Sequence, residues 1–175
     1  MPVDEHRKGA ESLNVSLCLL VTSDRVFQGL AEDKVTPLVA SLLSVHGISL
    51  GGSVVTPNKP AEIESALRSL LASCDVVLIT GGTGLGAKDV AVDVLKPMCS
   101  KDIPGFGELF RYLTYLKYGS AALATRAAAC AVGDRLVFAV PGSPEAVETA
   151  LTKLILPEVR HLIAELRSLR DSVLT

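Results

Sequence analysis

The chain has 175 residues, a formal net charge of -2 and a pI near 5.9. This length suits one domain with a substantial core, and the charge balance excludes the basic surface that nucleic-acid binding requires. No apolar run approaches the roughly 18 residues of a membrane span, so no membrane partner is predicted. Residues 1–14 are polar and lack a signal-peptide core, so we expect a disordered arm of a cytoplasmic protein. Residues 15–175 are expected to form a single domain.

The first half of the chain alternates apolar runs with helical stripes of apolar residues. The run over 15–21 is almost continuously apolar, as in a strand that is buried on both faces. We expect strands over residues 15–21, 48–55 and 75–80, and helices over 35–43, 63–71 and 89–95. Repeated strand–helix units predict an α/β fold: a three-layer, mostly parallel, doubly wound sheet with helices on both faces.

The second half is less regular and predicts a small antiparallel edge to the sheet. A helix is expected from a Pro-Gly turn to about Tyr118. Two apolar runs, 127–132 and 135–140, are separated by a Gly-Asp pair, which suits a two-residue hairpin. Ser143 is expected to cap the next helix, and Pro157 to begin the final one.

The four cysteines are scattered and contain no CxxC pair: Cys18, Cys74, Cys99 and Cys130. Because zinc-ligand spacing is missing, the favoured interpretation is that they are small buried hydrophobic residues. A disulfide is unexpected in an ordinary cytosol, although intracellular proteins of hyperthermophiles do contain them.

The most informative segment is a glycine cluster at the end of the third predicted strand. Residues 81–86 contain four glycines in six positions, and Asp89 follows. Such a cluster implies a backbone shape that other residues do not adopt, and at a strand end it usually brings main-chain N–H groups against an anion. A carboxylate beside this loop suits a magnesium ion or a proton acceptor. The alternative is a tight strand-to-helix turn in which Asp89 only caps the helix.

Two standard glycine motifs fit this loop only in part. Residues 82–87 match the dinucleotide-binding pattern, but that fingerprint needs a strand after its helix, and residues 97–102 do not have the pattern of a strand. Gly81 and Gly86 have the spacing of a phosphate-binding P-loop, but Ala87 stands where its lysine belongs. Neither motif is therefore predicted.

Five segments in chain order carry a more specific pattern: 20–25, 80–89, 104–108, 123–127 and 141–144. They resemble the MogA/MoaB family of molybdenum-cofactor biosynthesis proteins, whose signatures include Thr-Gly-Gly-Thr-Gly-x-x-x-Lys-Asp, Pro-Gly-Phe-Gly-Glu and Pro-Gly-x-Pro. Thr125 replaces the serine of the family's Leu-Ser-Arg element. The sequence is more similar to the MoaB branch than to the MogA branch. The related competence-damage family, which normally has leucine at the position of Thr83, is a remoter alternative.

The resemblance implies binding of molybdopterin, a pterin with a dithiolene and a terminal phosphate, and its adenylylation by ATP and Mg²⁺ with release of pyrophosphate. It implies that Asp89 and Asp24 are catalytic and that Asp89 and Asp93 hold the metal. The implied substrate-binding residues are Ser23, Thr80, Gly81, Gly82, Thr83, Gly84, Ser120, Thr125, Arg126, Pro141, Gly142 and Ser143. Backbone N–H groups over 81–84 are expected to hold phosphate, and Arg126 to supply positive charge for the anionic pterin. Such a transfer depends mainly on positioning and charge neutralisation.

Several of these residues have a purely structural alternative. Asp24 is also placed to cap a turn, Ser143 to cap a helix, and Arg126 to pair with a surface carboxylate. Ser120 and Thr125 lie in an Ala-rich segment, where small polar residues are often packing choices.

One position departs from the family's adenylyltransferases, which typically carry an Asp after the second strand. Here that turn contains Asn58, whose amide keeps the hydrogen-bonding shape but lacks the charge that holds magnesium. Asp93 is one methylene shorter than the glutamate that the family has after Asp89. The alternative function is therefore a non-catalytic protein that binds or delivers molybdopterin.

A homo-oligomer is also expected. The helix over 106–118 holds most of the few aromatic residues, which is more apolar surface than one side of a small sheet covers. Members of the family are trimers or hexamers, and the resemblance implies one of these states.

Overall fold

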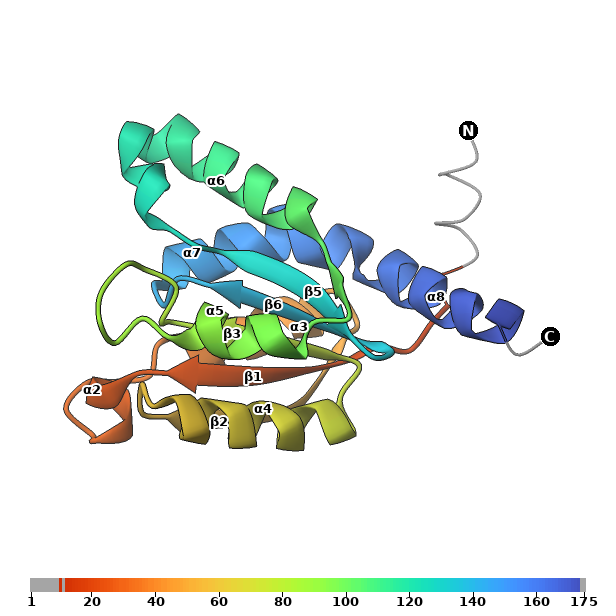
Figure 1. Cartoon of the computed structure of the whole chain (residues 1–175), viewed down its shortest axis with the longest axis horizontal. Helices are drawn as coiled ribbons and strands as arrows, with labels where there is room; N and C mark the ends of the chain where they lie inside the picture. The colour runs from red at the N-terminus through yellow and green to blue at the C-terminus, as the bar shows by residue number, and fades with distance from the viewer. Residues whose placement is uncertain (1–9, 11, 174–175) are drawn as a thin grey trace.

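In the part of the chain that the computed structural model describes, six strands form one sheet in the order β2-β1-β3-β6-β5-β4 (Figure 1). The structure describes residue 10 and residues 12–173, with side chains through Ser168. The strands are β1 (Ser16–Thr22), β2 (Ser49–Thr56), β3 (Val76–Thr80), β4 (Lys101–Asp102), β5 (Ala128–Val132) and β6 (Arg135–Val140). Strands β2, β1, β3 and β6 are parallel, and β5 and β4 run antiparallel to their neighbours. The predicted mostly parallel sheet with an antiparallel edge is confirmed.

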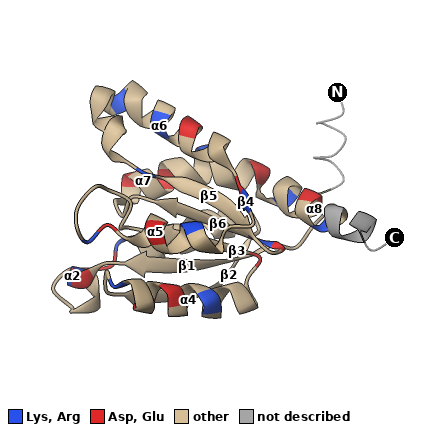
Figure 2. Cartoon of the chain, viewed as in Figure 1, with Lys and Arg blue, Asp and Glu red and all other residues tan. Residues whose placement is uncertain are grey.

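Helices cover both faces of this sheet, as predicted. They are α2 (Asp24–Phe27), α3 (Val35–Val45), α4 (Pro60–Ser73), α5 (Ala91–Leu95), η1 (Lys96–Met98), α6 (Pro104–Tyr118), η2 (Gly119–Ala124), α7 (Pro144–Thr149), the π-helical η3 (Ala150–Ile155) and α8 (Leu156–Val173). Successive side chains of a strand point to opposite faces, so Leu19 packs with α3, α6 and the α7–α8 segment, and Leu20 packs with α4 and α5. The central strands carry almost no charge, and apart from β4 and the start of β6 the charged residues lie on helices and loops (Figure 2).

Two elements differ from the sequence-based prediction. Residues 97–102 include β4, a two-residue strand paired with β5, which the sequence does not reveal because both of its side chains are exposed. The final helix, expected to begin at Pro157, begins one residue earlier as α8, and α7 runs into it through the π-helical segment η3 without a break. Pro157 has no N–H to donate to the preceding turn, and π-helical segments are one way in which a helix accommodates a missing bond.

The cysteines form two disulfides, Cys18–Cys74 and Cys99–Cys130, so the expectation that disulfides are absent is wrong. Burial was predicted for all four cysteines, and the prediction is correct for Cys18, Cys74 and Cys130 but not for Cys99, which is half-buried. Both bridges lie in the core layer between the sheet and helices α4 and α5. Sequence composition cannot show that two side chains far apart in the chain become neighbours, and here the separations are 56 and 31 residues.

Most of the predicted N-terminal arm lies outside the described residues. Within the described part, Ala10 is buried and Leu13 packs against the core on the α8 side. The Leu13 carbonyl accepts a hydrogen bond of 3.2 Å from Nε of Arg160 in α8. Contact with the domain therefore begins before residue 15.

Candidate functional site

The predicted site residues gather where β1, β3 and β6 end. The sheet register places Val21 beside Thr80, and Thr80 beside Val140. The segments that follow these strands therefore leave the sheet side by side at the end that also carries α2 (Figure 1). Carboxyl ends of parallel strands are the usual ligand-binding edge of an α/β sheet.

The glycine loop begins with a close crossing of main chains. Gly81 and Gly82 have φ angles of +95° and +66°, and a Cβ on Gly81 would lie 2.3 Å from the Thr22 carbonyl oxygen. Only glycine fits this position, because it combines a left-handed conformation with no room for a side chain. The Gly81 N–H donates to the Val140 carbonyl at 2.9 Å, so the expectation that this N–H holds phosphate is wrong.

The next three N–H groups remain candidates for anion binding. Within the described part of the chain, no acceptor pairs with the backbone N–H groups of Gly82, Thr83 and Gly84. Thr83 is buried, while Gly82 and Gly84 are half-buried. Neighbouring N–H groups without internal partners, in a turn of this kind, suit a phosphate oxygen.

Arg126 holds the rest of the glycine loop in place. Its Nε donates to the Gly84 carbonyl at 2.8 Å, and its Nη2 to the Asp89 carbonyl at 2.5 Å. The guanidinium also binds both carboxylate oxygens of Asp93, at 2.8 and 2.9 Å. Its backbone N–H donates to the Thr83 carbonyl at 2.8 Å. The structural alternative for Arg126, pairing with a carboxylate, is therefore observed, and the side chain fixes the loop from outside.

This ion pair shifts the pKa of both partners. The hydrogen bond from Arg126 lowers the pKa of Asp93, and the hydrogen bond to Asp93 raises the pKa of Arg126. Both groups are therefore charged near neutral pH, and bidentate pairs of this kind have well-defined geometry. Asp93 was predicted to hold metal, but Arg126 already binds both of its oxygens.

Arg126→Lys is expected to destabilise the loop although the positive charge is kept. Lysine lacks the planar fork that bridges Gly84, Asp89 and Asp93. We expect the free energy of unfolding to fall by roughly 1–2 kcal/mol and amide exchange over residues 84–89 to accelerate. Denaturant titration and hydrogen exchange would measure both effects. An unchanged exchange rate in the loop would show that Arg126 does not hold it.

Asp89 uses one carboxylate oxygen inside the loop. Its Oδ2 accepts a hydrogen bond of 2.8 Å from the Gly86 N–H. A Cβ at Gly84 or Gly86 would lie 2.7 or 2.9 Å from the same oxygen, so both glycines make room for the carboxylate. The side chain thus closes a turn inside the loop, but it does not cap α5, whose N-cap residue is Val90, so the helix-capping alternative is wrong. Among the described residues, no group donates a hydrogen bond to Oδ1 of Asp89.

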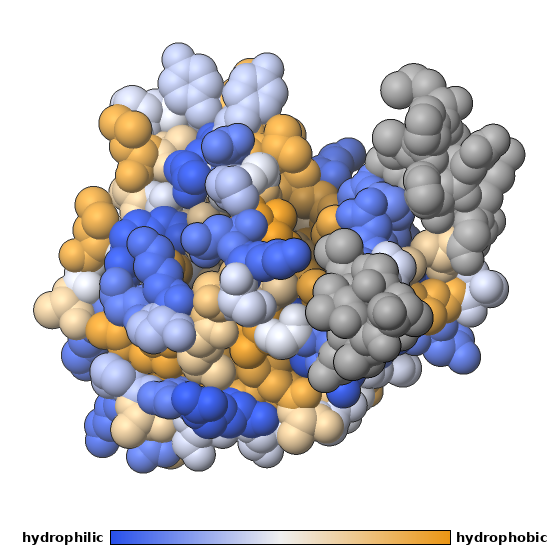
Figure 3. Space-filling view, turned by 45° about the vertical axis from the view of Figure 1, so that its right-hand side comes forward, coloured by the Kyte–Doolittle hydropathy of each residue, from blue (hydrophilic) through white to orange (hydrophobic). Residues whose placement is uncertain are grey.

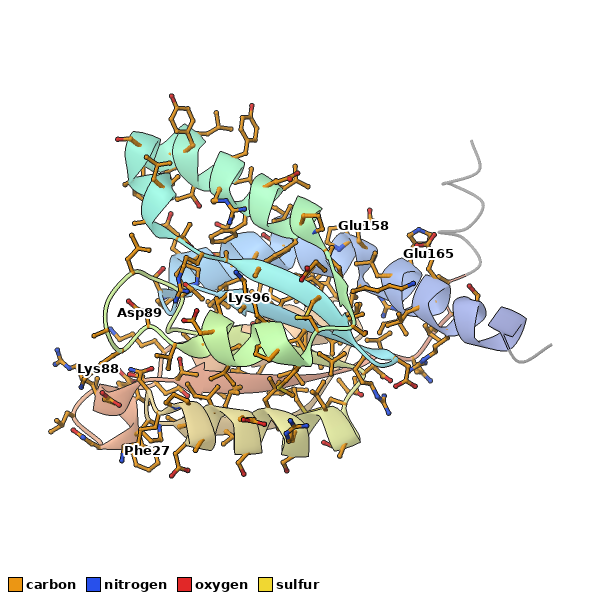
Figure 4. The ribbon with its side chains drawn as sticks, viewed as in Figure 1. Phe27, Lys88, Asp89, Lys96, Glu158 and Glu165 are labelled. Atoms are coloured by element: carbon orange, nitrogen blue, oxygen red, sulfur yellow. A yellow bond between two sulfur atoms is a disulfide. The ribbon has the colours of Figure 1, made fainter. Side chains whose placement is uncertain are left out.

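Asp24 lies across from the loop in a network that the sequence did not predict. Its Oδ1 accepts from the Asn58 N–H at 2.8 Å, and its Oδ2 binds Nζ of Lys88 at 2.6 Å. The hydrogen bond from Lys88 lowers the pKa of Asp24, with a further contribution from Asn58. Ser23 accepts from the Val26 N–H at 3.3 Å and caps α2. Lys88 therefore links the glycine loop to α2, at the end of the molecule where Figure 4 labels it.

A cavity of about 490 Å³ opens beside the loop, between α6, η2 and the start of α7. It is lined by Thr83, Gly84, Phe110, Leu113, Thr114, Lys117, Tyr118, Ala121, Ala124, Thr125, Pro141, Ser143, Glu145, Ala146 and Thr149. Five of these were predicted as substrate-binding residues: Thr83, Gly84, Thr125, Pro141 and Ser143. An apolar chamber with a few polar groups is the usual form of a small-molecule site.

Not every predicted residue reaches this cavity. Ser143 lines it and also caps α7, accepting from the Ala146 N–H at 3.2 Å, so the predicted helix cap is confirmed and the substrate-binding role stays a prediction. Ser23, Thr80 and Gly142 instead line a smaller cavity of about 220 Å³. Ser120 is exposed and lines neither cavity.

Among the lining residues that were not predicted, three form a hydrogen-bonded cluster: Lys117, Tyr118 and Glu145. Lys117 and Tyr118 are the last two residues of α6, and Glu145 lies in the first turn of α7. Nζ of Lys117 and the hydroxyl of Tyr118 both donate to the carboxylate of Glu145. The only sequence signal was the position of Glu145 directly after the Ser-Pro helix start.

The residues present suit magnesium only as part of a complex with phosphates. In the described ranges no three His, Cys, Asp or Glu side chains form a metal-binding group. Mg²⁺ usually takes one or two carboxylates plus substrate phosphates and water, and Asp89 has an oxygen for this role. Near Asp24, the Oδ1 of Asn58 is buried and finds no hydrogen-bond partner among the described residues, which is consistent with a neutral oxygen left for a ligand.

Known proteins share this sequence pattern along most of the chain. Residues 18–161 match the family described as "Probable molybdopterin binding domain". "Molybdenum cofactor biosynthesis protein B" of Staphylococcus aureus (strain MRSA252) is 40% identical over 166 residues, covering 93% of this chain and 98% of the relative. The chain belongs to the MogA/MoaB family. The expected family membership is thus confirmed.

Other relatives and structures of the MogA/MoaB family agree with this assignment. The corresponding protein of Bacillus subtilis (strain 168) is 36% identical over 173 residues, covering 95% of this chain and 98% of the relative. The crystal structure of "tungsten cofactor synthesizing protein MoaB from Pyrococcus furiosus" has a TM-score of 0.81 and 33% identity, covering 88% of this chain and 98% of that one. Across the described residues, no helix has the length and apolar character needed to cross a membrane.

Proposed function

We propose that this protein binds molybdopterin and adenylylates it with ATP and Mg²⁺. The observation that carries the proposal is the glycine loop, whose N–H groups at Gly82–Gly84 have no acceptor among the described residues and adjoin an apolar cavity large enough for a pterin. The relatives' names include both molybdenum and tungsten cofactor proteins. The proposal therefore names molybdopterin as the substrate and does not specify whether the finished cofactor carries molybdenum or tungsten.

In the proposed reaction, a phosphate oxygen of molybdopterin attacks the α-phosphorus of ATP. A new P–O bond forms, the bond to the β-phosphate oxygen breaks, and pyrophosphate leaves. The loop N–H groups would hold phosphate oxygens, and the remaining oxygen of Asp89, in the turn that it closes at Gly86, would hold a magnesium ion shared with the reacting phosphates. Magnesium, when bound, neutralises charge on the phosphates. Lys88, paired with Asp24, keeps positive charge at this end of the site.

The direct test is incubation of the purified protein with molybdopterin and Mg-ATP, with chromatographic detection of adenylylated molybdopterin and pyrophosphate. Formation of both products supports the enzyme. Tight binding of molybdopterin with no product would instead support the alternative, a binding or delivery protein. The neutral side chain of Asn58 beside Asp24 is the observation that favours this alternative.

The Asn58→Asp variant tests whether the carboxylate that is missing at position 58 limits the rate of adenylylation. If it does, the variant should raise adenylylation, most visibly at low magnesium, because a second carboxylate near Asp24 strengthens metal binding. If Asp24 and Asp89 suffice, added negative charge should instead weaken binding of the anionic pterin by about 1 kcal/mol. Initial rates across a magnesium titration separate the two results. An active Asn58→Asp variant beside an inactive parent would overturn the enzyme assignment for the natural protein.

We also propose a homo-oligomer, a trimer or hexamer, assembled through α6. Leu109, Tyr112 and Leu116 follow one another at helical spacing and are each more than half exposed, at 54%, 58% and 64%. Hydrophobic residues also reach the surface at the upper end of the molecule, where α6 lies (Figure 3). Exposed apolar stripes of this kind are typical of interfaces.

Leu116→Glu is expected to shift the protein from oligomer to monomer, because a buried unpaired carboxylate opposes association. Light-scattering chromatography at micromolar concentration would measure the mass. Val45→Glu, at an 80% exposed position at the end of α3, is the control and should leave the mass unchanged. A monomeric parent protein would refute the oligomer.

A further inference from the structure

Three polar side chains join the two walls of the large cavity. Nζ of Lys117 and the hydroxyl of Tyr118, at the end of α6, both donate to the carboxylate of Glu145 in the first turn of α7. All three residues line the cavity. The contact joins segments 27 and 28 positions apart in the sequence.

These residues decide the charge of the cavity. Among its described lining residues, Lys117 is the cation and Glu145 is the carboxylate, and the others are uncharged. The nearby Arg126 is committed to loop carbonyls and Asp93. The hydrogen bond with Glu145 raises the pKa of Lys117 and, reciprocally, lowers the pKa of Glu145, so both are charged near neutral pH.

The pair is exposed enough to be exchanged for a ligand. The side chains of Lys117 and Glu145 are 61% and 46% accessible. Ion pairs with this exposure contribute little to stability, and the lysine stem is long and flexible. Tyr118 gives Glu145 a second donor, so the carboxylate keeps a hydrogen bond when Lys117 turns away.

We propose that Lys117 is the anion-binding residue of this cavity, and that Glu145 holds it until a phosphate group takes the place of the carboxylate. The inference rests on the proposed function, because the ligand class is the phosphate monoester or polyphosphate that the reaction requires. Glu145 thereby selects for compact, multiply charged anions: a weakly charged ligand gains too little from Lys117 to replace an existing carboxylate partner. Lys117 and Glu145 are thus specificity residues with opposite effects on anion affinity.

The test uses Lys117→Met and Glu145→Gln in the full-length protein. Because every 1.4 kcal/mol is tenfold in affinity, loss of one close attraction should weaken anion binding about tenfold in Lys117→Met. Removal of the competing carboxylate should strengthen binding about threefold to tenfold in Glu145→Gln. Calorimetric titrations with molybdopterin, with Mg-ATP and with pyrophosphate identify which phosphate source the residue serves. Lys117→Met should also reduce the dependence of affinity on salt concentration.

Opposite effects are the decisive result, since both substitutions break the same ion pair. If the contact only braced α6 against α7, both variants would change affinity and thermal stability in the same direction, and the proposal would fail. Equal affinities in all three proteins would also overturn it. Matched controls are Lys101→Met in β4 and Glu62→Gln in α4, both exposed and outside the cavity.

The pyrophosphate titration separates this inference from the proposed function. Binding of pyrophosphate with the two opposite effects, but no binding of molybdopterin, would support the role of Lys117 while refuting the proposed function. Binding of molybdopterin that neither variant alters, together with unaltered pyrophosphate binding, would support the proposed function and refute the role of Lys117. A parent protein that binds none of the three ligands would refute both.

Discussion

Asp89→Asn is expected to reduce adenylylation about a hundredfold, the usual effect of losing one preorganised electrostatic contact in a reaction of this type. The amide oxygen of asparagine can still accept the Gly86 N–H that Oδ2 now accepts at 2.8 Å, so the turn should persist. The charge alone is lost. We therefore expect the free energy of unfolding to change by less than about 1 kcal/mol.

Initial rates of product formation and denaturant unfolding curves would measure the two quantities in parallel. Asp102→Asn is a suitable control, because Asp102 is an exposed residue of the short edge strand β4 outside both cavities. A variant that keeps full activity would remove Asp89 from the mechanism. A variant that loses activity only because it unfolds would show that the carboxylate serves the turn and not the chemistry.

The central strands of the sheet were predictable because burial dictates their composition. β3 is apolar apart from its last residue and buried throughout, so an apolar run predicted it correctly. The hairpin between β5 and β6 was also predictable, because Gly133 adopts a φ of +61°, a conformation in which glycine is strongly preferred. By contrast, β4 is defined by two pairings with β5 and has exposed side chains, so it leaves no periodic signal.

The position of the glycine loop in the fold was predictable from the sequence, but the side-chain partners of its residues were not. The sequence placed the glycine loop at the right strand end, because topology alone brings the ends of β1, β3 and β6 together. The sequence could not show that the guanidinium of Arg126 donates its hydrogen bonds to the carbonyls of the loop and to Asp93. It also could not pair Lys88 with Asp24, since 64 residues separate them. Such contacts depend on which distant segments the fold brings together, and the chemistry of single side chains does not specify this.

A glycine at a bulge in β2 makes room for the Cys18–Cys74 disulfide. Between Leu17 and Cys18 the register of β1 and β2 shifts, so that Gly51 is the extra residue of a bulge. A Cβ at Gly51 would lie 2.5 Å from Sγ of Cys74 and 3.4 Å from Sγ of Cys18. A side chain at this position would therefore collide with the bridge. The glycine of the bulge and the two cysteines form one packing arrangement.

Reduction of the Cys18–Cys74 bridge is expected to lower the free energy of unfolding by about 4 kcal/mol, the loop-entropy estimate for a bridge of this span. The bridge joins residues 56 positions apart, and reduction restores conformational freedom to that loop in the unfolded chain. The measurement uses the Cys99→Ala, Cys130→Ala double variant, so that only one bridge remains. Denaturant curves with and without a reductant then isolate the effect of the cross-link, because the oxidised and reduced proteins have the same side chains.

Glu62→Gln in the same background controls for variation between preparations, since Glu62 lies on the exposed surface of α4. Coincident curves for the oxidised and reduced forms, with thiol titration confirming their states, would show that the bridge does not stabilise the domain.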